Sequence, residues 1–388
     1  MSVTRIVRSV VVGAVSVGSL GACTLNYEVE ERTLAKTTPI VLQKPLDLLF
    51  VVDNSASMLE EQAALYRSVF DERCPITDTR RVPLDYQNPD RETFDDISEV
   101  CGLAQLMAAM GNDFHIGVIA TDVGTYDERF SAAQDPDGVH TQLPMRGCLQ
   151  GKGLITSDDD VAVDFRDAVI GLGVYGSPIE RGLDAMDIFL DPESRRAPGC
   201  ENDLDGFLRP DGQLMVVFVT DEDDCSHRDG SSGFPDELFF EPDAAGDWPE
   251  LFTESRSGDC YTRANELATI VGYAQHLRQL VTDQRTSEVL VSVVAGLRDD
   301  GAGLDAGACI ARDDGSIDGV CRAVLGASNT AECEQEGDCC TADGGNRYVD
   351  LARSINADSL MGSICAEDFR APLMPIFSLG ELGGDEVF

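Results

Sequence analysis

Four short runs of apolar residues, each bounded by polar turns, dominate the pattern of the chain. They lie at 46–52, 114–120, 214–219 and 289–295. Runs of this length that contain many β-branched residues are typical of buried strands. Segments with apolar residues at helical spacing lie between them. The pattern therefore predicts an α/β fold: a doubly wound, mostly parallel sheet with helices on both faces.

The segments with helical spacing are 58–70, 103–110, 165–172, 261–281 and 348–355. A further helix is predicted near residue 178, where Ser177 suits the N-cap and Pro178 the first helical position. The apolar residues of this helix are Ile179, Leu183, Met186 and Leu190. Loop-like stretches at about 71–112, 127–164, 225–260 and 298–345 interrupt the pattern, and we interpret them as insertions.

Three predicted strands end in a polar turn that carries an acid: Asp53, Asp122 and Asp221. Right-handed crossovers in a parallel sheet bring such turns to one edge, where ligands bind. The first turn adds Ser55 and Ser57 to Asp53. One carboxylate and two hydroxyls are hard oxygen donors that suit Mg²⁺. The alternative for the serines is capping of the following helix.

The Asp-x-Ser-x-Ser turn after the first strand resembles the metal-ion-dependent adhesion site of von Willebrand factor A (vWA) domains. The resemblance covers roughly 45–368 and is closest to exported bacterial vWA-containing lipoproteins. These share the Asp-Asn-Ser-x-Ser-Met start, the Glu61-Gln62 pair that follows it, and the Thr-Asp-Glu-Asp-Asp-Cys run at 220–225. The fold it implies is vWA-like, related to the Rossmann arrangement, with disulfide-rich loop insertions.

The resemblance also implies a metal site with ligands from three loops. Asp53, Ser55 and Ser57 match the first loop, and Asp221 matches the third. Ser177 is the best match for the second loop, where the usual Thr is absent, and Thr121 is a rival candidate. The implied cofactor is Mg²⁺, with Mn²⁺ or Ca²⁺ as alternatives. An acidic side chain of a protein partner then completes the coordination.

The charge of the chain excludes one class of partner. The net charge is −41, from 70 acidic against 29 basic residues. Such a charge repels phosphate backbones, which argues against nucleic-acid binding, and it favours cations or basic partners. A solvated acidic surface is the plainer interpretation. The acidic run 222–224 is open to the same two interpretations: a second cation site, for example for Ca²⁺, or solvated carboxylates.

The N-terminal residues have the pattern of an export signal. Arg5 and Arg8 precede an apolar core of 11 residues, too short to cross a bilayer as a helix. The sequence Leu-Gly-Ala-Cys that follows resembles the bacterial lipobox, which predicts a signal peptide at 1–22 and lipidation of Cys23. An ordinary secretory signal is the alternative. Thr24 after the Cys implies the outer membrane. We then expect a tether at 23–44, a domain at 45–370 and an extension at 371–388 that forms a hairpin or packs on the sheet edge.

The cysteine count favours disulfides. Of the 13 cysteines, 12 remain when Cys23 is set aside, and an even number in an exported chain is typical of disulfide pairing. The absence of any Cys-x-x-Cys pair argues against structural zinc. A Cys74–Cys101 bridge is predicted to close the first insertion, while the remaining connectivity is open.

Three functions are compatible with this sequence. The first is an envelope-anchored vWA domain that binds a protein partner through a divalent cation. The second is a structural or assembly lipoprotein with a vestigial metal site. The third is a metal-dependent hydrolase. We do not expect an enzyme, because there is no Gly-x-Ser-x-Gly motif and the four histidines lie far in sequence from the strand-end serines.

Overall fold

The computed structural model describes the central part of the chain. The described residues are 44–87, 91–123, 145, 147–174, 176, 180–191, 200, 202–227, 260, 267–299, 304–306, 309–310, 341–342, 344–355, 360–364, 366 and 369–373. The predicted signal peptide, Cys23 and the tether lie outside these residues, so the domain boundaries stay predictions. In the described part, no helix combines the length and apolar character needed to cross a bilayer.

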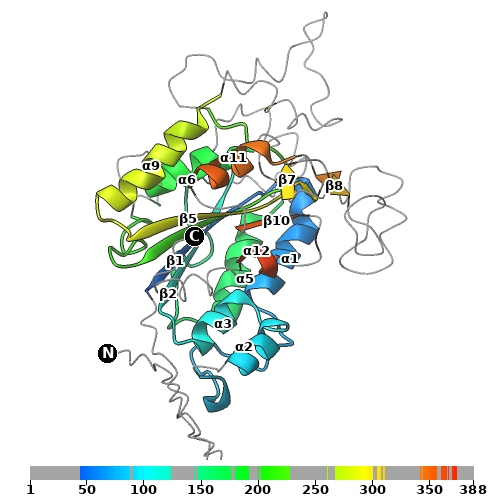
Figure 1. Cartoon of the computed structure of the whole chain (residues 1–388), viewed down its shortest axis with the longest axis vertical. Coiled ribbons are helices and arrows are strands. Elements are labelled where there is room, and N and C mark those ends of the chain that lie inside the picture. Colours follow the sequence, from blue (N-terminus) through cyan, green and yellow to red (C-terminus); the bar gives the residue numbers. More distant parts are fainter. Residues whose placement is uncertain are drawn as a thin grey trace, which may run out of the picture. The chain divides into compact units, whose positions relative to one another are not determined.

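A six-stranded sheet forms the centre of the domain, with the order β10-β5-β4-β1-β2-β3 (Figure 1). All pairs are parallel except β2 with β3. The mostly parallel α/β sheet predicted from the apolar runs is therefore present. The strands are β1 (Leu46–Val52), β2 (Phe114–Ala120), β3 (Ile155–Thr156), β4 (Gln213–Val219), β5 (Glu288–Ala295) and β10 (Met361–Ser363).

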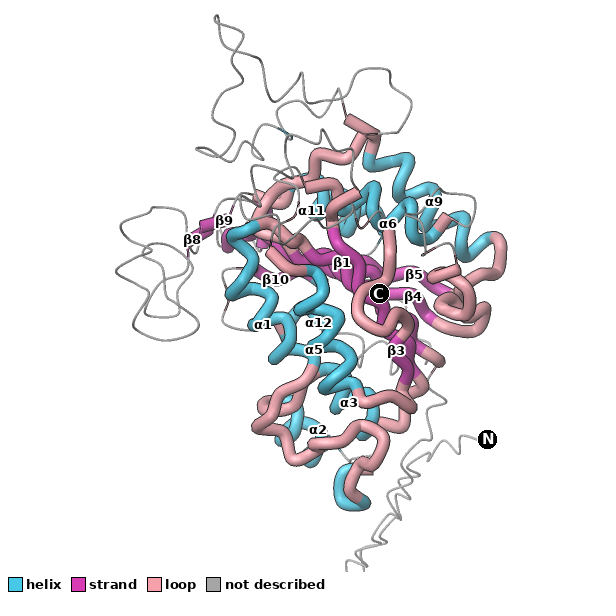
Figure 2. The backbone as a smooth tube through the Cα atoms, turned by 180° about the vertical axis from the view of Figure 1, so that it is seen from behind, coloured by secondary structure: helices cyan, strands magenta, loops and turns pink. Residues whose placement is uncertain are grey.

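Helices cover both faces of this sheet (Figures 1 and 2). One face carries α1 (Leu59–Val69), α3 (Leu103–Ala109), α5 (Val161–Leu172) and α12 (Arg370–Leu373). The other carries α6 (Gly182–Leu190), α9 (Ile270–Thr282) and α11 (Asn346–Ile355). The smaller elements are η1 (Ala56–Met58), η2 (Leu84–Tyr86), α2 (Arg91–Ser98), β6 (Leu297–Asp299), β7 (Leu304–Ala306), β8 (Cys309–Ile310) and β9 (Thr341–Ala342).

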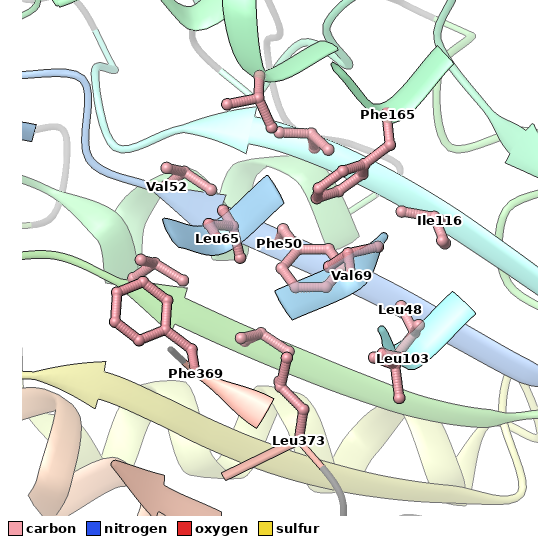
Figure 3. Close-up of a cluster of buried hydrophobic side chains, with 14 of the residues drawn as sticks. Leu48, Phe50, Val52, Leu65, Val69, Leu103, Ile116, Phe165, Phe369 and Leu373 are labelled. Atoms are coloured by element: carbon pink, nitrogen blue, oxygen red, sulfur yellow. The ribbon is translucent and has the colours of Figure 1, made fainter. Parts of the chain in front are cut away.

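Alternation along the strands divides the core into two layers. In β1, Leu48 and Phe50 pack under α1, α3 and α5 (Figure 3), while Leu49 and Val51 face the opposite layer. All four side chains are fully buried. Because a strand that is buried on both faces needs apolar residues at every position, the continuous runs in the sequence were a reliable signal for these strands.

The structure differs from the sequence prediction in three segments. Helix α6 begins at Gly182 with Arg181 as N-cap, not at Pro178 with Ser177 as N-cap, because the Glu180 carbonyl accepts a hydrogen bond from the backbone of Cys225 (2.7 Å). Helix α9 begins at residue 270, and 267–269 are not helical. The loop-like stretch 127–164 contains β3 and the start of α5.

Three disulfides join described cysteines: Cys74–Cys101, Cys148–Cys200 and Cys225–Cys260. The first confirms the predicted bridge across the first insertion. At the other end of the domain, α12 packs against the edge strand β10, since a Cβ at Gly362 would lie 2.6 Å from Pro372. This agrees with the expectation of packing on the sheet edge for 371–373, and 374–388 lie outside the described residues.

The strand order reverses beside β1, and this places the site. From β1 the chain moves outward through β2 to β3, and it then returns to β4 on the other side of β1 and continues to β5 and β10. In the register, Val52 pairs with both Ala120 and Val219. The residues that follow these three strands therefore meet at one edge, where the crevice of an open α/β sheet forms.

Candidate metal centre

Asp53 lies at the centre of this edge. It follows β1 directly, and its backbone N–H donates to the Val219 carbonyl (2.9 Å). Its carboxylate accepts hydrogen bonds from the Ser55 N–H (2.7 Å) and from the Thr220 hydroxyl (2.7 Å). The side chain has no solvent exposure. Asp53 thus joins the turn after β1 to the turn after β4.

The two serines of the first turn do not cap helix α1. The N-cap of α1 is Met58, which receives no side-chain capping bond. The Ser55 and Ser57 hydroxyls instead lie 3.0 Å from each other. Ser55 is buried and Ser57 is exposed. The capping interpretation is therefore wrong for this turn, and the two hydroxyls contact each other beside Asp53 instead.

The second loop approaches the first through backbone contacts. The Gly176 N–H donates to the Asn54 carbonyl (2.8 Å), and a Cβ at Gly176 would lie 2.3 Å from the Asn54 side chain, which would have to move to admit it. Gln62 of α1 holds the same corner by donating to the carbonyls of Asp53 (3.2 Å) and Gly173 (2.9 Å). Ser177, the predicted ligand of this loop, lies outside the described residues.

Glu180 and Thr121 bring further oxygens to the same edge. Thr121 follows β2, and its backbone N–H donates to Val52 (3.1 Å) beside Asp53. Its side chain and that of Glu180 are each 1% exposed. The Thr121 hydroxyl lies near enough to the Glu180 carboxyl to offset part of the pKa rise that burial causes there, but neither group forms a hydrogen bond of ordinary geometry in the described part of the chain. Thr121 therefore stays a candidate ligand, and Glu180 is a candidate that the motif did not indicate.

The third loop supplies Asp221. Thr220 continues the sheet ladder by donating its N–H to Val294 (3.0 Å). Asp221 follows it and is 5% exposed. Burial raises the pKa of its carboxyl well above the ordinary value, and the nearby Ser57 hydroxyl offsets only part of this rise. Its Oδ1 forms no hydrogen bond of ordinary geometry among the described residues. The structure thus brings Asp53, Ser55, Ser57 and Asp221 together at one place.

These carboxyl groups repel one another. Burial is the largest cause that raises the pKa of Asp53, Glu180 and Asp221 above their ordinary values. For Glu180 and Asp221, the next causes are the negative charges of Asp53 and Glu222, which raise both pKa values further. Hydrogen bonds from Ser55 and Thr220 lower the pKa of Asp53 partway. The site therefore carries more buried negative charge than its own hydrogen bonds offset.

Asp223 and Asp224, two of the three acids in the run 222–224, bond to groups of the protein. Asp223 and Asp224 are fully buried, not solvated, and their carboxylates are committed to groups of the protein rather than free for a second cation. Asp224 pairs with Arg347 of α11 (3.0 Å) and accepts the Leu183 N–H (3.0 Å). Asp223 accepts the Arg347 N–H (3.0 Å). This run therefore fixes the third loop to α6 and α11.

The arginines around the site are engaged with other acids. Arg181 follows Glu180 in the sequence, but its guanidinium bonds the Asp184 carboxylate (2.5 Å) and the His227 carbonyl (2.9 Å). Arg347 bonds Asp224. Consequently, the neighbouring charges that most strongly shift the pKa of Glu180 and Asp221 are all carboxylates.

The donor set of the site fits a hard divalent cation. Carboxylates and hydroxyls are the ligands that Mg²⁺, Ca²⁺ and Mn²⁺ prefer. Several buried oxygens, among them Thr121 Oγ1, both carboxyl oxygens of Glu180 and Asp221 Oδ1, form no hydrogen bond of ordinary geometry among the described residues. Buried polar atoms without partners are costly in a folded protein unless an ion or water satisfies them. A cation beside Asp53 meets both needs.

Among the described residues, the acids of the sheet edge do not form a group of three ligand atoms within 4.8 Å of one another, and the group that does lies elsewhere and is not a metal site. One ligand atom from each of Cys148, Cys200 and Asp203 lies within 4.8 Å of the others. The two sulfurs form a disulfide, so neither is a thiolate, and the Asp203 carboxylate accepts the Leu149 N–H (2.7 Å). This group stabilises the loop before α5.

Glu180 is the site residue that the sequence did not reveal. Because Glu180 lies one turn before apolar residues at helical spacing, the sequence pattern predicts that it belongs to the first turn of a helix. Only its burial beside Asp53 distinguishes it from an ordinary helix-start acid, and burial is not visible in a single sequence. Asp53, Ser55, Ser57 and Asp221 were identifiable because their spacing within each turn is local.

Comparison with known proteins adds no assignment. A scan against protein-family models and a search of curated proteins both gave no match, so the interpretation of this site depends on its residues alone.

Proposed function

We propose that this chain is an envelope-anchored, doubly wound vWA-type domain that binds a protein partner through a divalent cation. Asp53, Ser55, Ser57 and Asp221 hold the cation, with Ser177 or Thr121 from the second loop. When bound, the cation supplies a positive charge to which an acidic side chain of the partner attaches. Mg²⁺ is the expected ion, with Mn²⁺ or Ca²⁺ as alternatives.

The observation that carries this proposal is the uncompensated negative charge at the sheet edge. Asp53 and Asp221 are each at most 5% exposed, and burial, followed by the negative charge of Asp53, raises the pKa of Asp221. Isolated buried carboxylates are strongly unfavourable, so they are retained where a cation or another charged group neutralises them. The reversal of strand order beside β1 supports a ligand site at this edge.

The location in the envelope has separate support. The signal-like residues 1–22 and the lipobox-like Cys23 predict export and a lipid anchor, most simply in the outer membrane. Three disulfides in the described part of the chain are typical of an oxidising compartment. In this proposal, the membrane serves only to anchor the chain. The partner that binds through the cation is a protein.

Calorimetric titration with Mg²⁺, Mn²⁺ and Ca²⁺ tests the metal site. We expect the wild-type chain to bind at least one of these ions. Asp53→Asn should weaken binding roughly tenfold or more, as is usual when a metal ligand or its direct support is removed. Asp85→Asn is the matched control, because Asp85 is exposed in η2 and its substitution should leave the affinity unchanged.

The same variants separate the alternatives. Absence of metal binding by the wild type would contradict the proposal and favour an assembly lipoprotein with a vestigial site. Turnover of ester or phosphoester substrates that disappears in Asp53→Asn would instead favour a hydrolase. A pull-down from envelope extract seeks the partner. The partner should be a protein that the wild-type chain retains in the presence of Mg²⁺ and releases when a chelator is added. The Asp53→Asn variant should not retain it.

A further inference from the structure

Strand β1 connects two ends of the domain that have different tasks in the proposed function. Its amino end follows Pro45, where the predicted tether meets the described part of the chain. Its carboxyl end leads directly into Asp53. All seven residues of β1 pair in parallel with both β2 and β4. The residues that follow β4 therefore lie at the edge of the sheet opposite to the tether.

This arrangement decides how a pulling force acts on the domain. When the loop after β4 is pulled against an anchor before β1, the two strands must slide along each other. In a parallel pair, the hydrogen bonds between the strands are evenly spaced along this direction, so they bear the load together. In an antiparallel pair, the same two chain ends would lie at one edge, and the hydrogen bonds would open one after another.

A polar cluster fixes the amino end of β1 to the segments before both neighbouring strands. Asp47 is fully buried and accepts hydrogen bonds from the backbone N–H (2.9 Å) and the Nε (2.7 Å) of Arg209, which lies before β4. The guanidinium of Arg209 also donates to the Leu46 carbonyl (2.9 Å). It pairs with the carboxylate of Asp113, the residue before β2 (2.9 Å). We call Asp47, Arg209 and Asp113 the entry clamp.

The entry clamp is not needed to bury the strand. Asp47 is the single charged residue of β1, and the other six are apolar. An apolar side chain in its place would avoid the cost of removing a charge from water. The charged hydrogen bonds add a directional attachment, whereas apolar contacts are non-directional and oppose sliding less. The clamp thus holds β1 where a pull on the preceding residues would first displace it.

We propose that β1 is the load-bearing strand of this domain, and that the entry clamp locks it against extraction when a bound partner pulls on the anchored chain. The inference goes beyond the proposed function, from which it takes the anchor before β1 and the partner site at the opposite edge. Force that reaches Asp53 passes along the backbone of β1 to the anchor. Force that reaches Asp221 passes from β4 to β1 through the hydrogen bonds between the two strands.

Single-molecule pulling in metal-free buffer tests this inference. One handle is attached to the N-terminus of the chain without residues 1–22, and the other to an azide-bearing amino acid in place of Glu222. Arg209→Gln should raise the rupture rate at constant force roughly tenfold or more, because a charged hydrogen bond contributes a factor of that size. Asp47→Asn, which keeps the shape of the side chain and removes its charge, should also raise this rate. It replaces Arg209→Gln if that variant does not fold.

Two controls isolate the clamp and the path of the load. Gly102→Ala strains a contact away from β1, because its Cβ would lie 2.4 Å from the Val69 carbonyl. It should leave the rupture rate unchanged although it destabilises the domain. Moving the second handle to exposed Ser57 confines the load to the backbone of β1 and the turn after it. No rupture is then expected at forces that separate β1 from β4.

The outcomes separate this inference from the proposed function. If the clamp variants rupture at the wild-type rate, or if Gly102→Ala accelerates rupture as much as they do, the clamp does not resist extraction and the inference is overturned. Rupture through the Ser57 handle at the same force would overturn the load path along β1. A chain that binds no divalent cation in calorimetry contradicts the proposed function, whereas the rupture rates in metal-free buffer still decide the role of the clamp.

Discussion

Two glycines of this domain stand where a neighbouring segment lies within 3 Å of the place that a Cβ would take. At Gly176, a Cβ would lie 2.3 Å from the Asn54 amide oxygen. At Gly102, which precedes α3, a Cβ would lie 2.4 Å from the carbonyl carbon and oxygen of Val69. The first contact holds the second loop against the turn that follows β1, and the second holds α3 against the end of α1.

Gly102→Ala should destabilise the domain. The atoms that oppose the new methyl group belong to the backbone, which cannot rotate away, so we expect a loss of about 1–3 kcal/mol, as for overpacked positions. Urea unfolding followed by circular dichroism, with the disulfides intact, measures it.

Gly171→Ala is the control for this substitution. Gly171 lies in α5, and its nearest neighbour would be 3.6 Å from the Cβ. Alanine favours a helix over glycine by about 0.5–1 kcal/mol, so this variant should be neutral or more stable. Equal effects of the two substitutions would contradict the steric explanation.

At the scale of single residues, the sequence predicted which residues form each turn, but not which residues from distant parts of the chain surround them. Asp53 and its serines were recognisable from local spacing, and so was Asp221. Glu180 was not, since its significance depends on burial next to residues far away in the chain. The serines also illustrate an ambiguity of short motifs: the same residues suit a helix cap or a metal, and only the Met58 N-cap decides against capping.

Helices α6 and α9 pack against the same face of the sheet, and one ionic contact joins their exposed sides. His276 Nδ1 of α9 lies 2.5 Å from Asp187 Oδ1 of α6. The hydrogen bond to Asp187 is the main cause that raises the pKa of His276. The contact therefore stabilises the folded state when His276 is protonated.

The sign of the pH dependence follows from this shift. A raised folded-state pKa gives stability that is fully present below the unfolded pKa of about 6.5 and is lost as the pH rises through the higher folded pKa. His276→Gln should remove this dependence. The effect should stay below about 1 kcal/mol because Asp187 is 40% exposed. Unfolding free energies at several pH values measure it.

Asp187→Asn supplies the check on this prediction. It removes the same contact from the other helix, so it should reduce the pH dependence as His276→Gln does, and the double variant should add little. If the single variants keep the wild-type slope through neutral and mildly alkaline pH, the contact does not contribute to stability.

The elements themselves were largely predictable, and their boundaries less so. The four long strands follow from continuous apolar runs, because both of their faces are covered. The start of α6 was misplaced because Ser177 and Pro178 have the local chemistry of a helix start, whereas a contact between distant segments, Cys225 with Glu180, decides the backbone before Gly182. β3 was missed because a two-residue strand has no periodicity.

On the scale of the whole molecule, disulfides join segments far apart in the sequence. Cys74–Cys101 closes a stretch with a separation of 27 residues, and its sulfurs lie in a small core cluster of their own with Ile76, Ile97, Leu106 and Ala109. Cys225–Cys260 instead begins at the residue that bonds Glu180. The sequence indicated that the cysteines pair, but a bridge between distant segments has no local signature, so the second and third could not be predicted.

Removal of the two bridges should therefore have different consequences. Replacing Cys74 and Cys101 together by alanine should lower the unfolding free energy by roughly 3–4 kcal/mol, from the entropy of the opened loop, and leave Mn²⁺ affinity unchanged. Replacing Cys225 and Cys260 should lower Mn²⁺ affinity as well. Unfolding and Mn²⁺ titration of both variants measure this, and identical Mn²⁺ affinities in the two variants would contradict the difference.

The pairing of Asp224 with Arg347 has a consequence for the order of events in the cell. The two residues are 123 positions apart, and a chain emerges from the ribosome or a translocation channel with its N-terminus first. Until α11 has emerged, the loop after β4 would have to bury Asp224 without its counter-charge, which is strongly unfavourable. The sheet edge that carries Asp53 and Asp221 is therefore one of the last parts of the domain to reach its final arrangement.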